Sequence, residues 1–363
     1  MVGKIPQYLS RYSLERAPFG LLPDPDFFFP APPHLSARET LKYTIESGEG
    51  FMVLIGEAGT GKTLLVRVLL REINKNKVPA ILISPMVTPT ELLRLILVEL
   101  GEEGCQADDM ATLLARFQRT LLDLAGKGKE LLIIVDEAQN LPVDSLEQLR
   151  MLSNIETNNR KLLQILLVGQ PGLKEKLQDP ALGQLSQRVV VTENLRPFDL
   201  KESVEYINFR LARAGQGGLD MSRGAGKLLY KDSMGIPRLI NRLMDRTLLF
   251  GCADISDGLT ITHVRRAMAT LPETGRRERR FLLWPKKIFF SLVILLAVVA
   301  GCILFPVIAR SPAEAVNDHS SGTAAVVPGS EKGKKVNEPG SVSIRDIIVR
   351  QQQERVENKI TMQ

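Results

Sequence analysis

The segment 56–63 constrains the fold of this chain more than any other part of the sequence. It reads Gly-Glu-Ala-Gly-Thr-Gly-Lys-Thr, which matches the complete G-x-x-x-x-G-K-[ST] pattern. An apolar segment, 51–55, precedes it, and 64–72, rich in helix-forming residues, follows it. A strand, a glycine-rich turn and a helix in this order aim backbone N–H groups and a helix N-terminus at one point, where a polyphosphate fits. The sequence therefore predicts a phosphate-binding loop rather than a chance glycine-rich turn.

The predicted loop implies a nucleoside triphosphate and a magnesium ion. Glycine lets the backbone approach the phosphates closely, because no Cβ obstructs it. Lys62 is expected to reach the β- and γ-phosphates, and the Thr63 hydroxyl to bind Mg²⁺. We expect ATP as the nucleotide, bound by Gly56, Glu57, Ala58, Gly59, Thr60, Gly61, Lys62, Thr63 and Leu64.

Asp136 and Glu137 follow the apolar segment 131–135, which has the composition of a buried strand. In a parallel sheet, the carboxyl ends of the strands are where ligands bind. We expect Asp136 to help hold Mg²⁺ and Glu137 to orient and polarise the water that attacks the γ-phosphate. Acidic residues that decorate a helix N-terminus are the alternative. An Asp-Glu pair, rather than a lone Asp, favours a hydrolase over a small-molecule kinase.

Three further polar residues are candidates for the same site. Gln170 follows a predicted strand and is expected to touch the γ-phosphate or the attacking water, or to be a simple polar strand end. Arg188 is predicted to act as an arginine finger that enters a neighbouring subunit's site. Such fingers raise the rate of phosphoryl transfer about 10³–10⁵-fold where they have been measured. A surface salt bridge is the alternative. Arg238 opens a predicted helix and is expected to contact the γ-phosphate, unless it is an ordinary helix-start arginine. His34 is interpreted as structural rather than catalytic.

Strand-like and helical patterns alternate along the first 195 residues. The predicted strands are 51–55, 79–83, 131–135 and 162–168. Because they are almost wholly apolar and separated by helices, they indicate a parallel sheet covered on both faces. Helices are predicted at 36–47, from a capping box of Ser36 and Glu39, at 89–100, from a capping box of Thr88 and Glu91, and at 109–125 and 143–157.

The pattern becomes entirely helical after about residue 195, with helices expected at 200–214, 222–233, 237–250 and 262–271. We therefore predict an α/β P-loop NTPase core followed by a small helical subdomain. The predicted domains are an N-terminal arm (1–35), the nucleotide-binding core (36–198), the helical subdomain (199–272), a basic juxtamembrane segment (273–287), a transmembrane helix (288–308) and a mostly disordered external tail (309–363).

The transmembrane prediction rests on a run of 21 residues without a charge, 288–308, long enough as a helix to cross a bilayer core of about 30 Å. A buried core helix is the alternative, but such helices are rarely so uniformly apolar. Basic residues are concentrated just before the run, and only Arg310 follows it closely. The positive-inside rule then predicts a single-pass membrane protein, with the nucleotide-binding domain in the cytoplasm and the tail outside.

The charge distribution and the cysteines argue against two other classes of protein. The formal net charge of +6 would suggest a nucleic-acid partner, but +5 of it lies between residues 276 and 287. We therefore expect no nucleic-acid partner. The three cysteines are odd in number and have no metal-like spacing, so we expect no disulfide framework.

A set of motifs between about residues 18 and 271 points to one family. It comprises Pro18-Phe19 and Pro23-Asp24-Pro25-Asp26-Phe27, the loop 56–63, Asp136-Glu137-Ala138-Gln139-Asn140-Leu141, the segment 161–165, Gly169-Gln170-Pro171, Gln187-Arg188 and Gly235-Ile236-Pro237-Arg238. Together they resemble the membrane-bound AAA+ ATPases of the general secretion pathway A type, which are associated with type II secretion and have relatives in pilus biogenesis and in exopolysaccharide or exosortase loci. The resemblance implies an AAA+ core with a helical lid, a nucleotide between the subunits of a homo-oligomer, and partners in envelope secretion or export machinery. Gly172 departs from the acidic residue usual at its position, and the region after 308 is too short for the peptidoglycan-binding domain of some members.

The leading hypothesis is a membrane-anchored ATPase that drives or regulates assembly of a secretion, pilus or polysaccharide export complex. Two alternatives remain open. One is a DNA-dependent AAA+ ATPase that assists transposition or replication, which the predicted span and the lack of a basic patch in 1–270 oppose. The other is a slowly hydrolysing ATP switch that acts as a scaffold.

Overall fold

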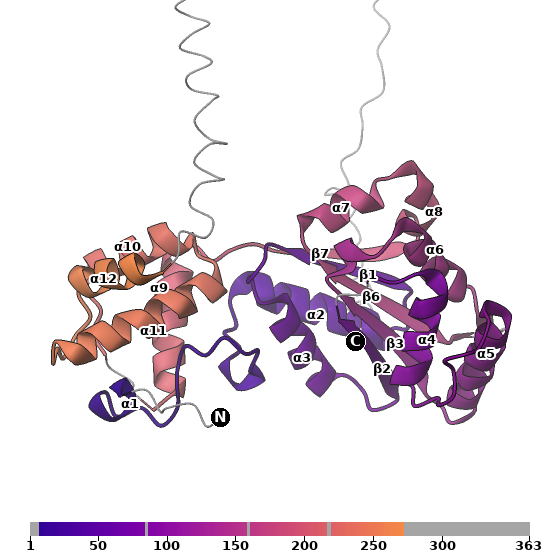
Figure 1. Ribbon diagram of the computed structural model, residues 1–363, viewed down its shortest axis with the longest axis horizontal. Coiled ribbons are helices and arrows are strands. Elements are labelled where there is room, and N and C mark those ends of the chain that lie inside the picture. Colours follow the sequence, from indigo (N-terminus) through magenta and orange to yellow (C-terminus); the bar gives the residue numbers. More distant parts are fainter. Residues whose placement is uncertain (1–6, 84–85, 158–159, 216–218, 272–363) are drawn as a thin grey trace, which may run out of the picture. The chain divides into compact units, whose positions relative to one another are not determined.

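The computed structural model describes residues 7–83, 86–157, 160–215 and 219–271 (Figure 1). These residues belong to one compact unit within 1–287. None of the helices among them is long and apolar enough to cross a membrane. The predicted span at 288–308, the basic segment 273–287 and the tail 309–363 lie outside the described residues.

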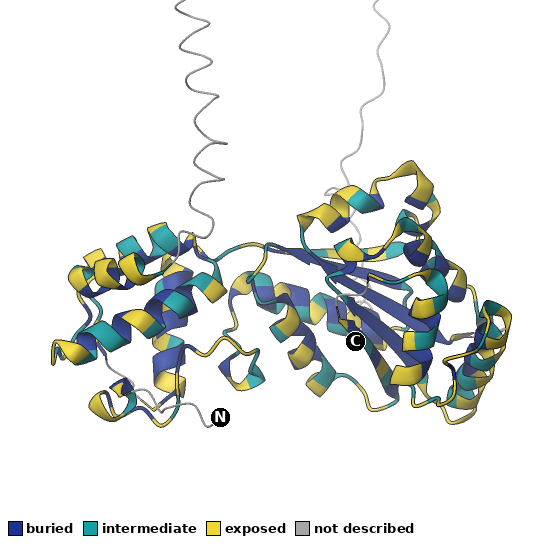
Figure 2. Ribbon diagram, in the orientation of Figure 1, coloured by how far each residue is buried: buried dark blue, intermediate teal, exposed yellow. Residues whose placement is uncertain are grey.

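Five parallel strands form the central sheet, in the order β2-β3-β6-β1-β7. They are β1 (Phe51–Gly56), β2 (Lys77–Ile83), β3 (Glu130–Asp136), β6 (Leu163–Gly169) and β7 (Val189–Leu195). Nearly every residue of β1, β3 and β6 is buried, as the dark strands of Figure 2 show. The outer strand β7 instead alternates between partly buried and exposed residues. The predicted parallel α/β sheet is confirmed.

The two faces of the sheet bury separate clusters of apolar side chains. Along β1, Phe51, Val53 and Ile55 pack with helices on one face, whereas Met52 and Leu54 pack with helices on the other. This division follows from the alternation of side chains along a strand. The first face is covered by α4 (Pro89–Glu99), α5 (Met110–Gly126), α6 (Val143–Leu152), α7 (Pro171–Leu177) and α8 (Gly183–Ser186), and the second by α2 (Pro32–Glu46) and α3 (Lys62–Glu72).

The carboxyl ends of three central strands lie side by side. The parallel register pairs Ile55 of β1 with Gly169 of β6, and Val135 of β3 with Leu167 of β6. Each of these strands therefore delivers its next residues to the same edge of the sheet. That edge is where a parallel α/β sheet binds its ligands.

Four helices form a separate core after β7. They are α9 (Leu200–Arg213), α10 (Arg223–Ser233), α11 (Pro237–Ala253) and α12 (Ile261–Thr270), close to the predicted bounds. The N-terminal arm, with α1 (Tyr8–Arg11) and the 3₁₀ turn η1 (Pro25–Phe27), contributes Tyr8, Tyr12, Leu14, Phe19 and Phe27 to this core. The arm is thus part of the packing of the helical subdomain.

Two predicted helix boundaries are wrong. The helix expected at 36–47 begins at Pro32 instead, because proline at the first helical positions already has a helical φ; Ser36 lies inside the helix, where its carbonyl accepts a bond from the Thr40 hydroxyl. The helix expected at 143–157 ends at Leu152. Ser153 and Asn154, both weak helix formers, follow it, and the chain then forms a short antiparallel pair of β4 (Glu156–Thr157) and β5 (Arg160–Lys161). The capping box of Thr88 and Glu91 is confirmed.

Candidate nucleotide-binding and catalytic site

The loop 56–63 has the conformation that its glycines allow. Gly59 and Gly61 have φ angles of +85° and +101°, a region that other residues rarely adopt. At Gly56, an added Cβ would lie 2.7 Å from the Thr60 hydroxyl oxygen and 2.9 Å from the Leu195 carbonyl oxygen. Helix α3 starts at Lys62, within the last residues of this segment. The loop therefore has the strand–loop–helix geometry that binds phosphates at a helix N-terminus.

The Lys62 side chain lies inside the loop and is 5% exposed. Its Nζ donates to the carbonyl oxygens of Gly56, at 2.9 Å, and Glu57, at 3.2 Å. Burial holds the pKa of Lys62 below its ordinary value, although the carboxylates of Glu137 and Asp136 act to raise it. The ammonium group is thus placed at the centre of the loop, opposite two carboxylates.

Thr63 and Asp136 form an oxygen pair that fits a magnesium ion. The Thr63 hydroxyl donates to Asp136 Oδ2 at 2.7 Å, and Asp136 Oδ1 accepts the Glu137 N–H at 2.9 Å. Hydroxyl and carboxylate oxygens are ligands that Mg²⁺ prefers, and it usually takes few protein ligands beside phosphates and water. In the described part of the chain, no group of three or more His, Cys, Asp or Glu side chains forms a closed metal cage.

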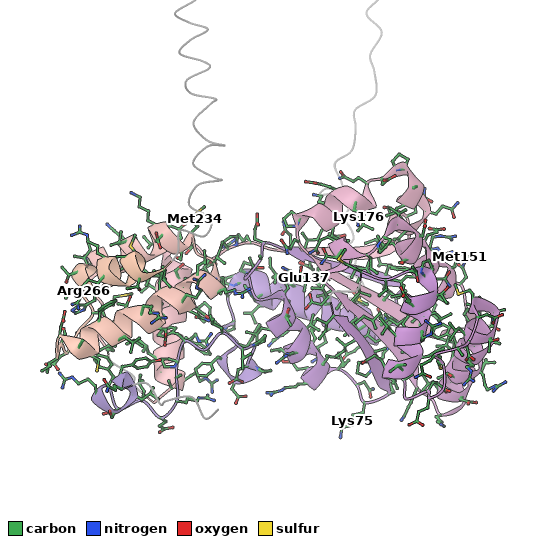
Figure 3. All side chains as sticks on the ribbon, in the orientation of Figure 1. Lys75, Glu137, Met151, Lys176, Met234 and Arg266 are labelled. Carbon is green, nitrogen blue, oxygen red and sulfur yellow. The ribbon has the colours of Figure 1, made fainter. Side chains whose placement is uncertain are left out.

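Glu137 has a strained backbone and a firmly held carboxylate, at the end of β3 (Figure 3). Its φ of +54° lies in the left-handed region, which costs a residue with a Cβ about 1–3 kcal/mol. Its Oε2 accepts bonds from Gln139 Nε2 at 2.5 Å and from Gln170 Nε2 at 2.9 Å. Burial raises the pKa of Glu137, but the two amide donors and the Lys62 charge outweigh burial and leave the pKa below its ordinary value. The carboxylate is therefore ionised at neutral pH, as a general base must be.

Gln139 is a site residue that the sequence did not single out. It lies in the 3₁₀ turn η2 (Ala138–Asn140), two residues after Glu137, and its side chain also accepts the Gln170 N–H at 3.0 Å. The backbone carbonyl oxygen of Gln139 accepts a hydrogen bond from Lys176 Nζ of α7, at 2.7 Å. The only sequence signal was its place in the motif that carries the resemblance.

The structure places Arg238 and His34 directly against the phosphate loop. The Arg238 N–H donates to the Gly59 carbonyl at 3.2 Å, so that α11 begins on the loop. His34 Nε2 lies 2.8 Å from the Thr60 carbonyl oxygen, which can only accept, so this ring nitrogen carries the hydrogen. Burial holds the pKa of His34 below its ordinary value, although the bond to Thr60 acts in the opposite direction. His34 thus supports the loop structurally.

Arg188 lies apart from these contacts. It follows α8 and is exposed, and its Nη1 donates to the Ser153 hydroxyl at 2.9 Å, just after the end of α6. The structure therefore brings together Lys62, Thr63, Asp136, Glu137 and Gln170, with Arg238 on the loop. It holds Arg188 on the surface of the same chain.

Comparison with known proteins agrees with this geometry. Residues 45–177 match the AAA domain family. The chain has a P-loop AAA+ fold, which implies nucleotide binding. Over 294 residues it is 34% identical to the general secretion pathway protein A of Aeromonas hydrophila, an alignment that covers 81% of this chain and 53% of that protein. The chain thus spans about half the length of this curated relative.

Solved structures support the fold. The chain is similar to the ORC2 protein of Aeropyrum pernix, in its ADPNP-ADP complexes, with a TM-score of 0.56 and 17% identity over 70% of this chain and 72% of that one. It is also similar to Cdc6p of Pyrobaculum aerophilum, with a TM-score of 0.55 and 16% identity over 72% of this chain and 74% of that one. At these identities the likeness concerns the fold alone.

Proposed function

We propose that this protein is a membrane-anchored AAA+ ATPase of the general secretion pathway A type, which drives or regulates assembly of an envelope secretion, pilus or polysaccharide export complex. The observation that carries the proposal is the convergence of Lys62, Thr63, Asp136 and Glu137 at one edge of the sheet. The 34% identity to general secretion pathway protein A supports the choice of family.

In the proposed mechanism, the loop and Lys62 hold the β- and γ-phosphates of ATP, and Thr63 and Asp136 hold Mg²⁺. The bound ion would supply charge neutralisation for the phosphates. Glu137 orients the attacking water and accepts its proton, and Gln170, which already bonds Glu137, lies within reach of the same water. Arg238 contacts the γ-phosphate from the helical subdomain, which acts as a lid.

The proposal includes three features of the whole protein. The segment 288–308 anchors it in the inner membrane, with the ATPase domain in the cytoplasm and the tail in the periplasm. This orientation is inferred from the excess of basic residues before the segment. The protein assembles as a homo-oligomer in which Arg188 of one subunit completes the site of the next. Its partners are components of the envelope machinery.

Binding and phosphate-release assays on the 363-residue chain in detergent test the mechanism. Lys62→Ala is expected to lose ATP binding, measured with a fluorescent ATP analogue. Glu137→Gln is expected to keep binding and to lose at least about 10²-fold in phosphate release, because an amide cannot take the proton of the water. Glu175→Gln, on the exposed surface of α7, is the matched control. Equal turnover by the wild type and Glu137→Gln would remove Glu137 from the mechanism.

The same assay separates the alternatives. Strong stimulation of phosphate release by DNA would favour a DNA-dependent ATPase. ATP binding without multiple turnovers would favour a switch that acts as a scaffold.

A further inference from the structure

Both ends of the Gln139 side-chain amide are bonded within the candidate site. Its Nε2 donates to Glu137 Oε2 at 2.5 Å, and its Oε1 accepts the backbone N–H of Gln170 at 3.0 Å. Glu137 follows β3, and Gln170 follows β6, the neighbouring strand. The one side chain therefore joins the two strand ends that carry the proposed catalytic groups.

The orientation of this amide is fixed by its partners. A backbone N–H can only donate, so the amide oxygen must face Gln170. The NH₂ group then faces the carboxylate of Glu137, which can only accept when it is ionised. Glutamate and leucine have nearly the size of glutamine, yet neither makes both bonds. Asparagine is shorter by one methylene group.

Two neighbouring residues hold Gln139 in this position. A Cβ at Gly169 would lie 2.8 Å from Gln139 Oε1 and 2.8 Å from Leu173 Cδ2, so glycine leaves the space that the amide occupies. Lys176 Nζ donates to the carbonyl oxygens of Gln139 at 2.7 Å and of Leu141 at 2.6 Å. The turn that carries Gln139 is thus tied to α7, which begins after Gln170.

We infer that Gln139 is a positioning residue, which locks the Glu137 carboxylate to the end of β6 so that Glu137 and Gln170 approach the attacking water as one unit. The inference rests on the proposed ATPase function, because it assigns Gln139 to the action of Glu137. It also accounts for the left-handed backbone of Glu137, whose strain is held in place by these bonds. Within the described part of the chain, the hydrogen bonds of Gln139 go to Glu137, Gln170 and Lys176 and not to the loop that would hold the phosphates, so we expect nucleotide affinity not to depend on it.

The test separates turnover from binding in the 363-residue chain. Gln139→Leu removes both bonds, and Gln139→Glu places a second carboxylate next to that of Glu137. Each substitution is expected to lower kcat about 10–100-fold, because a catalytic group that is misplaced by about 1 Å can lose about 10²-fold in rate. The Kd for a fluorescent ATP analogue should stay within about twofold of the wild-type value. Gln178→Leu, at the exposed end of α7, is the matched control and should leave both quantities unchanged.

A second perturbation approaches Gln139 from its neighbour. Gly169→Ala pushes against the amide and is expected to lower kcat in the same way, again with little change in Kd. Values of kcat within about twofold of wild type in both Gln139 variants would overturn the inference and leave the ATPase proposal intact. A parallel loss of ATP affinity and of thermal stability would overturn it as well, since Gln139 would then be a purely structural residue. A wild-type protein that binds ATP without hydrolysing it would overturn the proposed function and this inference together.

Discussion

Gly59 and Glu137 both have positive φ angles within the candidate site, +85° and +54°. For glycine this conformation costs little, whereas Glu137 holds it against steric repulsion from its own Cβ. The difference is informative at the residue scale. Glycine is required at position 59 so that the loop can contact the helical subdomain. Glu137, the residue proposed to activate water, has a strained backbone. The sequence indicated that the glycines of the loop allow a close approach to the phosphates, but it predicted neither the contact of Gly59 with the helical subdomain nor the strain at Glu137.

Gly59→Ala tests how closely the loop meets the lid. An added Cβ would lie 2.7 Å from the Cβ of Arg238 and 3.2 Å from Cγ2 of Ile236. The left-handed conformation alone costs an alanine about 1–2 kcal/mol, and the contact adds to this. We expect a lower midpoint of thermal unfolding and weaker binding of the fluorescent ATP analogue.

Gly172→Ala is the control for this substitution. Gly172 lies in α7, and an added Cβ there would have no atom within 4 Å. Its effect on stability should be under about 1 kcal/mol. If Gly59→Ala binds ATP as well as Gly172→Ala does, the close approach of loop and lid does not matter for binding.

At the scale of elements, the arm is the unexpected part of the fold. Tyr8 of α1 is fully buried in the helical subdomain, and its hydroxyl donates to Asp245 of α11 at 2.7 Å. Further along the arm, the Pro23 carbonyl accepts a bond from Arg67 of α3 at 2.8 Å. The arm therefore connects the lid with the helix that follows the phosphate loop.

Tyr8→Ala is expected to destabilise the protein strongly. Removing a fully buried aromatic ring costs about 3–5 kcal/mol, and Asp245 would also lose its partner. The free energy of unfolding from urea titration measures the change. Tyr43→Ala is the matched control, since Tyr43 of α2 is 70% exposed and its loss should change stability by about 0.5 kcal/mol or less. Equal effects of the two substitutions would contradict the packing of the arm into the lid.

The elements that the sequence predicted well are those specified by local signals. The strand–loop–helix around Lys62 and the capping box of Thr88 and Glu91 each lie within one short segment, and both are present. The position of Gln139 and the packing of Tyr8 depend on residues more than 30 positions away, Gln170 and Asp245. No periodicity or cap carries that information. The helix boundary at Pro32 was missed because a capping-box pattern four residues later competed with the proline.

At the scale of the whole molecule, the proposed site is divided between parts of the chain and, we propose, between chains. The core and the helical subdomain meet at the loop through Gly59 and Arg238, so we expect a nucleotide bound there to contact both. Lys62, Glu137 and Gln170 bond to the loop or to one another, whereas Arg188 bonds to Ser153. Because Arg188 is exposed, we expect it to leave Ser153 and to enter the site of a neighbouring subunit when the two associate.

The last prediction tests this division between subunits. If Arg188 acts on a neighbour's site, phosphate release per subunit should rise with protein concentration, and confinement in a membrane should favour the associated form. Arg188→Ala should bind ATP normally and turn over about 10³–10⁵-fold more slowly. Arg119→Ala, at an exposed position of α5, is the matched control and should behave as wild type.

Mixing two inactive proteins gives the sharper result. Lys62→Ala keeps Arg188, and Arg188→Ala keeps Lys62, so a mixed pair of neighbours contains one site with both groups. Partial recovery of activity on mixing is therefore expected, provided that the interface forms beside an empty site. If activity per subunit stays flat over a wide dilution series and mixing restores nothing, Arg188 serves its own chain through Ser153, and the homo-oligomer is not needed for catalysis.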